Sequence, residues 1–315
     1  MKDTKATGAL AQTDIKKQTP AWLRNMPLHL MLLPSLLLLL IYSYFPLLGN
    51  VMAFQRFRPN LGFFRSEWIG LANFQYVMQL PNTFQVLWNT FFIAGMKIIA
   101  GIIIPVIVAL LLNEMRSIRY KRAVQTIIYF PYFLSWIVLT GVFIDILSPS
   151  EGAVGLAFQF FGLEAPFFLG DPDVFPYTMV ATDSWKNFGF GTIVYLAALT
   201  GIDPNLYEAA EIDGANRWGQ TLHITLPGLM PIVILMSVLA MGNVLNAGFD
   251  QIFNLYNPQV YVTGDILDTL VYRLGLEDAQ YGVATAVGLF KSIVSFVMLT
   301  TAYIVAYKFT DYRVF

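Results

Sequence analysis

Long apolar stretches separated by short polar segments dominate this chain. A bilayer core about 30 Å thick requires roughly 20 helical residues per crossing, and stretches of that length recur along the sequence. One of them contains "LPSLLLLLIYSYFPLL", which is too apolar for a helix exposed to water. The pattern predicts an all-α integral membrane protein with six transmembrane helices, at about Pro27–Leu48, Val86–Asn113, Val124–Leu147, Tyr177–Gly201, Gly228–Phe249 and Gly282–Tyr307.

Charged residues between the stretches indicate how the chain is oriented. Loops on the cytoplasmic side of a membrane carry an excess of Lys and Arg. With a cytoplasmic N-terminus, twelve of the nineteen Lys and Arg residues fall inside, four fall outside and three lie within stretches. Both ends are therefore predicted to be cytoplasmic, with residues 1–26 as a tail and 27–315 as one membrane domain. The first stretch is too long for a signal peptide and lacks a small-residue cleavage site.

Composition agrees with this assignment and excludes several classes of function. Hydrophobic residues make up 57% of 315, charged residues 12%, and mean hydropathy is +0.60, whereas about 25% of a soluble domain is charged. A net charge of −1 without a basic patch argues against a nucleic-acid partner. The absence of cysteine excludes disulfides and thiolate chemistry, and only two histidines argue against a metal site.

One polar segment, "EAAEIDGANRWGQTLHITLP", interrupts the apolar pattern between the fourth and fifth stretches. Just before it, Asp203 followed by Pro204 is a strong helix start, because a carboxylate caps free N–H groups and proline needs no partner. Gly214 ends that helix, as the residue that best adopts a left-handed cap. A second short helix is expected at about 215–222. Residues 203–227 are therefore predicted to form two short helices joined at Gly214 on the cytoplasmic face.

Two roles are open for this segment. It is either an amphipathic helix resting in the lipid headgroups or a surface on which another protein docks. The acids Glu208, Glu211 and Asp213 weaken the first interpretation, because anionic lipids repel them. Ala209 and Ala210 allow a partner to approach the backbone closely. These residues favour docking against a basic groove.

The same segment resembles the EAA loop of ABC-importer permeases, whose pattern is Glu-Ala-Ala, three residues, Gly, nine residues and Ile-x-Leu-Pro. Segments such as "WIGLANFQYV" and "ALLLNEMRSIRYKRAVQTIIYFPYFLSW" extend the resemblance, nearly end to end, to the sugar-importer permeases of the polysaccharide- and lipoprotein-linked branch. The positions assigned to coupling are Glu208, Ala209, Ala210, Asp213, Gly214, Ile224, Leu226 and Pro227.

The resemblance implies a type I ABC-importer permease fold and a multi-pass location in the bacterial cell membrane. In that family the loop is a coupling helix docked in a cleft of a cytoplasmic ATPase, with the counterpart of Glu208 facing the ATPase. The implied partners are a dimeric ATPase that holds ATP and Mg²⁺, a second permease, an extracellular solute-binding protein and an oligosaccharide. No cofactor is expected on this chain.

The fourth stretch carries polar residues at membrane depth, where they are costly and usually face a protein interior or a water-filled path. Asp183 and Lys186 share a helix face and can pair with each other. Trp185 and Asn187 lie beside them. One interpretation is a cavity in which Trp185 stacks on a sugar and polar groups bind hydroxyls. The other is an ion pair that only holds helices together.

The fifth stretch carries Asn243, Asn246 and Asp250 at a spacing that forms one polar stripe on a helix. Such a stripe is expected along an aqueous path or along a helix–helix seam. Together with the fourth stretch it gives the candidates for the translocation path. Lys97 and Lys291 are expected to extend toward the membrane surface or to bond within the pair of permeases.

Nothing in the sequence could hydrolyse ATP, because the G-x-x-x-x-G-K-[ST] run that cradles phosphates is absent. The energy that drives this protein is therefore expected to come from a partner protein that acts through the loop. Two other classes are weighed against this importer. A secondary, ion-coupled transporter should show repeated halves and midplane ion sites, and it needs no docking loop. An intramembrane enzyme would have only Asp183 and Lys186 as candidates.

Overall fold

The computed structural model describes residues 25–310, so most of the predicted cytoplasmic tail and the last five residues lie outside the described part. The chain divides into two compact units, residues 1–50 and 51–315. Unit 1 contains α2 (Met26–Leu39), the π-helical segment η1 (Leu40–Tyr44) and the start of the 3₁₀ segment η2 (Phe45–Phe54), whose last four residues belong to unit 2. Every side chain of α2 is exposed, as expected for a helix whose apolar surface meets lipid.

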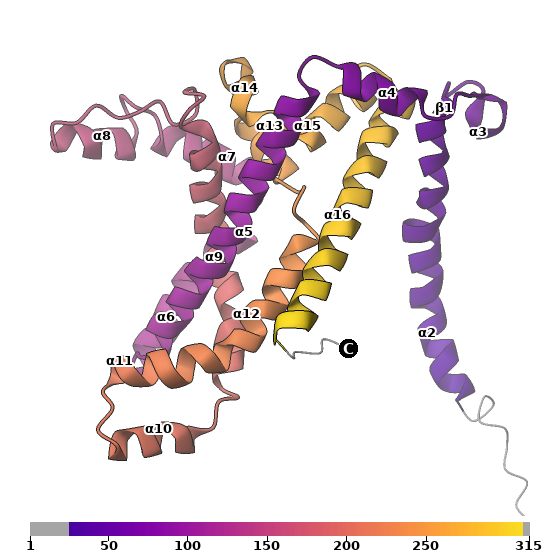
Figure 1. Cartoon of the computed structure of the whole chain (residues 1–315). Coiled ribbons are helices and arrows are strands. Elements are labelled where there is room, and N and C mark those ends of the chain that lie inside the picture. The colour runs from indigo at the N-terminus through magenta and orange to yellow at the C-terminus, as the bar shows by residue number, and fades with distance from the viewer. Residues whose placement is uncertain (1–24, 311–315) are drawn as a thin grey trace, which may run out of the picture. The chain divides into compact units, whose positions relative to one another are not determined.

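Unit 2 is built around two long helices that pack side by side, α5 and α9 (Figure 1). The loop helices α10 and α11 lie at one end of the unit, and α4, α14 and α15 lie at the other. Its main helices are α4 (Ala72–Gln79), α5 (Thr83–Asn113), α6 (Ile118–Tyr129), α7 (Trp136–Ile146), α8 (Ala153–Phe160), α9 (Phe175–Leu199), α10 (Pro204–Ile212), α11 (Arg217–Gln220), α12 (Leu226–Met241), α13 (Phe249–Leu255), α14 (Tyr261–Gly264), α15 (Leu267–Tyr272) and α16 (Tyr281–Thr310).

Short elements complete unit 2 between the long helices. Antiparallel strands β1 (Gln55–Arg56) and β2 (Glu67–Trp68) form a hairpin around α3 (Gly62–Arg65). The amide of Asn73 on α4 donates to the carbonyls of Ala53 and Gln55 at 2.9 and 3.0 Å. The remaining segments are η3 (Phe130–Phe133), η4 (Thr221–Thr225), η5 (Pro258–Val260) and η6 (Arg273–Glu277).

The described residues contain four helices long and apolar enough to cross a membrane. They are Met26–Phe54, Thr83–Asn113, Arg217–Met241 and Tyr281–Lys308, and a fifth crossing results if the bent pair Ile118–Phe133 and Trp136–Ile146 is one span. The fourth predicted stretch forms the 25-residue helix α9, which is not among these because its polar residues lower its hydropathy. The all-α membrane fold is therefore confirmed, and the number of six crossings stays a prediction.

Two predicted continuous helices are broken in the structure. The third stretch turns by 105° between α6 and α7. Pro131 lies at this turn, and proline cannot continue the ladder of helical hydrogen bonds. Ser135 then caps α7 by accepting from the N–H of Val138 at 3.3 Å. The fifth stretch ends as a helix at Met241 and resumes at Phe249, after Gly248 with φ +90°.

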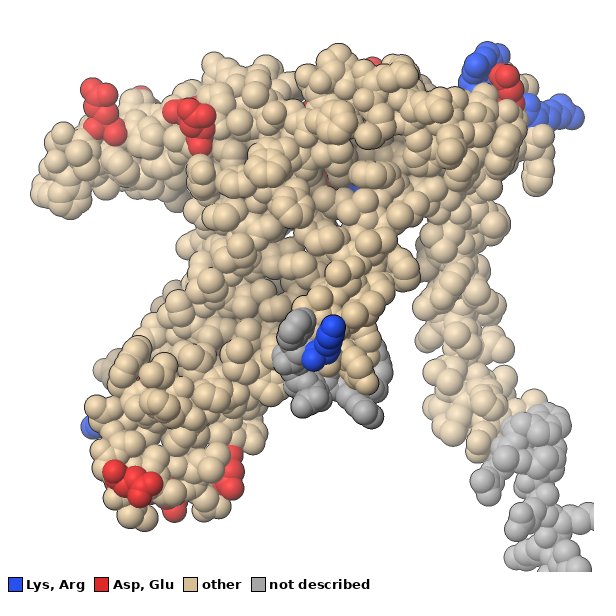
Figure 2. Space-filling model, viewed as in Figure 1, with Lys and Arg blue, Asp and Glu red and all other residues tan. Residues whose placement is uncertain are grey.

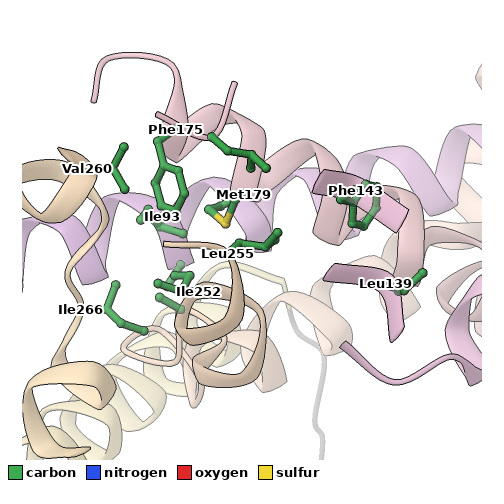
Figure 3. Packing of buried hydrophobic residues seen from close by; sticks show 12 residues of the cluster. Ile93, Leu139, Phe143, Phe175, Met179, Ile252, Leu255, Val260 and Ile266 are labelled. Atoms are coloured by element: carbon green, nitrogen blue, oxygen red, sulfur yellow. The ribbon is translucent and has the colours of Figure 1, made fainter. Parts of the chain in front are cut away.

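Side chains from four helices fill the core of unit 2 (Figure 3). Ile93 from α5, Phe175 and Met179 from α9, and Ile252 from α13 are fully buried. Leu139 from α7 belongs to the same cluster. The helices α6 and α9 approach closely at Gly189, where a Cβ atom would lie 1.9 Å from the carbonyl oxygen of Ile128. The glycine therefore permits close helix packing.

Candidate functional site

The loop between α9 and α12 begins with the helix start that the sequence predicts. Asp203 caps α10, since its Oδ1 accepts from the N–H of Asn205 at 2.9 Å, and Pro204 is the first residue of the helix. A capping carboxylate satisfies an N–H that has no partner inside the helix. The polar start of α10 is therefore fixed by local hydrogen bonding rather than by burial, because none of its residues is buried.

Gly214 ends α10 in the left-handed conformation that the sequence predicts, with φ +79°. The N–H of Gly214 donates to the carbonyl of Glu211 at 3.1 Å, and the N–H of Ala215 donates to Ala210 at 2.8 Å. These two bonds form a Schellman motif, which satisfies carbonyls at a helix end. The loop therefore reverses direction at a hydrogen-bonded turn with a defined geometry.

The second helix of the loop is shorter than predicted and joins the next span directly. α11 is Arg217–Gln220, not 215–222, because Asn216 caps it by accepting from the N–H of Gly219 at 2.8 Å. A π-helical segment, Thr221–Thr225, then leads into α12. Arg217–Met241 is thus one helical run, so a displacement of α11 would be transmitted to the span without an intervening flexible segment.

One side-chain contact joins the loop to the rest of unit 2, and a second joins the two halves of the loop. Arg217 forms an ion pair of 2.8 Å with Glu114, which follows α5. The hydroxyl of Tyr207 on α10 lies 3.0 Å from that of Thr225 in η4. The ion pair is solvent-exposed, and such pairs contribute little to stability, but together the contacts link α10, α11 and α5.

The coupling positions differ in exposure. Glu208, Ala209, Asp213, Gly214 and Pro227 are exposed, whereas the remaining three, Ala210, Ile224 and Leu226, are partly buried. Two large apolar side chains beside them are also exposed, Ile212 at 86% and Trp218 at 74%. Figure 2 shows acidic side chains gathered at this end of unit 2. An exposed surface that combines acids with large apolar groups is suited to contact another protein.

The predicted ion pair between Asp183 and Lys186 does not form. Asp183 pairs instead with Lys97 of α5, at 3.7 Å. Lys186 donates to the carbonyl of Tyr132 at 2.7 Å and lies over the rings of Tyr132 and Trp136. The sequence could not show this, because partners on one helix face compete with partners on neighbouring helices.

Lys97 does not extend to the membrane surface as expected. Its side chain is only 8% exposed, and its Nζ donates to the carbonyl of Ala247 at 2.6 Å and to Oε1 of Gln251. The amide of Gln251 in turn donates to the Met179 carbonyl at 2.9 Å and to the Thr182 hydroxyl at 2.7 Å. Lys97 therefore binds the chain at the break between α12 and α13, where helical carbonyls lose their partners.

Lys291 also has a partner within this chain. It forms an ion pair of 2.6 Å with Asp268 on α15, and both side chains are 22% exposed. Lys291 is thus paired inside this chain, and its expected place at the membrane surface or in the pair of permeases stays a prediction. Residues 25–310 contain no group of three or more His, Asp or Glu side chains placed to hold a metal ion.

A cavity of about 270 Å³ lies between α5 and α9 in the middle of unit 2. Asp183, Ser184 and Asn187 contribute its polar lining, and the Ser184 hydroxyl is buried without a hydrogen-bond partner among the described residues. Trp185 is not part of the lining, because it lies on another side of the helix, 45% exposed and edge-on to Phe143. Of the four candidates in α9, the structure thus brings Asp183 and Asn187 to one cavity.

Asn243, Asn246 and Asp250 do not form a stripe on one helix, because the helix ends before Asn243. Asn243 and Asn246 lie in the break, and Asp250 lies in the first turn of α13. All three are exposed in this chain. Gly248 was the signal of this break in the sequence, since a glycine inside an apolar helix lowers its stability. The sequence did not predict that Lys97 and Gln251 bind the chain at this break.

These features define a multi-pass helical membrane protein with a capped, exposed loop at one end. Residues 101–311 match the family described as binding-protein-dependent transport system inner membrane component. The chain belongs to this family, the non-catalytic membrane subunits of ABC importers, in which a separate subunit hydrolyses ATP. This membership decides against the ion-coupled secondary transporter and the intramembrane enzyme.

Relatives resemble the chain over nearly its whole length. It is 38% identical to the protein LplB of Bacillus subtilis, over 93% of this chain and 92% of that protein. It is 37% identical to the polygalacturonan/rhamnogalacturonan transport system permease protein YteP of the same organism, over 90% and 88%. A chain of the bacterial alginate ABC transporter in complex with an alginate pentasaccharide-bound periplasmic protein matches with a TM-score of 0.85 and 36% identity, over 93% and 98%.

Proposed function

We propose that this chain is one of two permease subunits of an importer in a bacterial plasma membrane, and that it moves an oligosaccharide delivered by an extracellular binding protein. The saccharide class is supported by relatives named for polygalacturonan, rhamnogalacturonan and alginate. ATP and Mg²⁺ would be held by a dimeric ATPase on the cytoplasmic side, so the chain itself needs no cofactor.

The observation that carries this proposal is the loop of α10 and α11. It is capped at Asp203 and Asn216, turns at Gly214, and continues as helix into α12. Its exposed surface is acidic, so a basic cleft on the ATPase complements it. When the ATPase closes around ATP, it binds one position of the loop better than the other, and this difference in affinity shifts the membrane helices toward one state.

The translocation path is proposed to run past the polar residues of α9 and of the break after α12. Asp183 and Asn187 line the cavity between α5 and α9. Asn243, Asn246 and Asp250 are exposed in the single chain, although polar groups at membrane depth are costly unless water or protein covers them. A second permease and a water-filled path between the two subunits would supply that cover. Trp185 and Lys186 flank this region, and Trp185 is exposed enough to stack on a sugar.

The test is to purify the tagged chain with its neighbours and to measure transport in proteoliposomes. The panel consists of alginate pentasaccharide and oligosaccharides of polygalacturonan and rhamnogalacturonan. We expect an ATPase to co-elute, ATP hydrolysis to rise when the loaded binding protein is added, and at least one saccharide to be imported. Absence of an ATPase would refute the importer assembly, and import of none of the panel would refute the saccharide class.

Reversing one charge separates docking from folding. We expect Glu208→Lys to lower uptake about tenfold or more, which corresponds to about 1.4 kcal/mol of lost docking free energy, while the amount of chain in the membrane stays normal. Glu208 is exposed, so its replacement disturbs little within the chain. The matched control is Glu277→Lys, an exposed acid at the other end of unit 2. Equal uptake by both variants would contradict docking through Glu208.

A further inference from the structure

A second polar cavity lies at the end of unit 2 opposite the loop of α10 and α11. It has a volume of about 310 Å³ between the start of α5 and α14, and it is lined by Asn82, Gln85, Val86, Tyr261, Val262, Asp265 and Arg273. A neighbouring cavity of about 200 Å³ shares several of these residues. Helix α5 has 31 residues and is therefore about 46 Å long, and its other end meets the loop through Glu114. With the loop in the cytoplasm, this cavity opens on the outer face.

Arg273 is held in a fixed position at this cavity. Its guanidinium donates to both oxygens of Asp265, at 3.3 and 2.5 Å, and Asp265 also accepts from the hydroxyl of Thr269 at 2.7 Å. Such a two-point contact fixes the plane of the guanidinium. Arginine has five N–H donors, and no further acceptor for Arg273 occurs among residues 25–310. The side chain is 30% exposed, so its other donors are available to a ligand.

Two amides complete the polar lining. Gln85 donates to Asn89 at 2.8 Å, and Asn89 donates to the carbonyls of Val262 and Asp265 at 2.9 and 3.1 Å. This chain of bonds fixes the orientation of Gln85 and leaves its carbonyl oxygen as an acceptor. The side chain of Asn82 has no hydrogen bond within the described part of the chain. The cavity therefore presents Arg273 and Gln85 in fixed orientations, together with the unbonded amide of Asn82.

The fourth contribution is an aromatic ring. Tyr261 is 39% exposed, and its ring is supported by Tyr256 at 4.9 Å and lies 5.8 Å from the Arg273 guanidinium. An exposed ring beside planar polar groups matches a pyranose, which has an apolar C–H face and hydroxyls at its edge. Ligand pockets hold a few placed polar groups in a mainly apolar lining. At about 310 Å³ the cavity is at the small end of their range, which suits a short part of an oligosaccharide.

We propose that this outer cavity binds a pyranose unit of the saccharide before it enters the membrane path, with the ring on Tyr261 and its oxygen atoms on Arg273, Gln85 and Asn82. This inference rests on the proposed function, because it assigns a first binding site to the same substrate. A site at the outer mouth would hold the chain of sugars in place as the binding protein releases it.

The test uses the purified complex and one saccharide. This saccharide is the member of the alginate, polygalacturonan and rhamnogalacturonan panel that the unaltered complex imports. Tyr261→Leu removes the ring and keeps an apolar side chain, whereas Tyr261→Phe keeps the ring. Tyr76→Leu is the matched control, since Tyr76 on α4 is 44% exposed and does not line the cavity. Binding of the radiolabelled saccharide to the complex is measured without ATP, and the KM and maximal rate of uptake are measured separately.

We expect Tyr261→Leu to weaken binding and raise KM about tenfold, with little change in the maximal rate, because one stacking contact is worth about 1.4 kcal/mol. Tyr261→Phe, which keeps the ring, is expected to retain most of the binding that Tyr261→Leu loses, and Tyr76→Leu is expected to behave like the unaltered complex. Unchanged binding in Tyr261→Leu, or equal losses in Tyr261→Leu and Tyr76→Leu, would overturn the site. In either case import by the unaltered complex would still support the proposed function, so the two failures are distinguishable.

Discussion

We expect the replacement of Gly214 by proline to abolish saccharide uptake, while the chain still inserts into the membrane. Proline fixes φ near about −65° and has no N–H, whereas Gly214 has φ +79° and donates to the carbonyl of Glu211. The substitution therefore removes the turn between α10 and α11 without touching the membrane helices. Saccharide uptake and membrane content, measured on the same cells, report the two effects separately.

Gly214→Asn is the matched variant for this prediction. Asparagine is one of the few residues with a side chain that visits the left-handed region, and no atom lies within 4 Å of a Cβ at this position. We expect this variant to retain most of the uptake. Normal uptake with proline at this position, or a loss with asparagine as large as that with proline, would contradict the role of the turn.

Replacing Lys97 with methionine is expected to cause the largest loss of stability. The change leaves Asp183 without its ion-pair partner and leaves the Ala247 carbonyl and Gln251 Oε1 without their donor. Removing one member of a buried ion pair costs roughly 3–5 kcal/mol, and because Asp183 is 22% exposed we expect a loss at the lower end of this range. The measurement is thermal unfolding of the detergent-purified complex, followed by loss of the monodisperse peak in size-exclusion chromatography.

Two further variants identify the cause of that loss. Lys97→Met combined with Asp183→Asn removes the uncompensated charge and should recover part of the stability. Lys291→Met should cost less, because it removes one ion pair, to Asp268, whereas Lys97 also donates to the Ala247 carbonyl and to Gln251. A single Lys97→Met variant as stable as the unaltered complex, or a double variant no better than the single one, would show that the Lys97 contacts do not hold the break in place.

The local features of the fold could be predicted from the sequence. The cap at Asp203 and the turn at Gly214 depend on residues within a few positions of each other, so residue type alone indicates them. Breaks inside apolar stretches were harder to predict. Pro131 and Gly248 stand where the third and fifth stretches break, but hydropathy alone continues across both.

Contacts between distant segments could not be predicted. Asp183 has a cation on its own helix and a second one on α5, and only the packing of the two helices selects Lys97. Gln251 carries no signal of its role until its neighbours Met179 and Thr182 are known. The cavity with Tyr261 and Arg273 likewise joins residues from α5 to residues almost two hundred positions later, and no local pattern marks it.

The most direct test of the account is a cross-link from the loop to the ATPase. The chain has no cysteine, so Ile212→Cys introduces a single thiol at a position that is 86% exposed, and a maleimide-linked benzophenone can be attached to it. After irradiation of the assembled complex, we expect an adduct with the nucleotide-hydrolysing subunit, and none from Phe160→Cys at the other end of unit 2. Failure of Ile212→Cys to cross-link to that subunit, or its labelling by a membrane-impermeant maleimide from outside intact cells, would contradict the account.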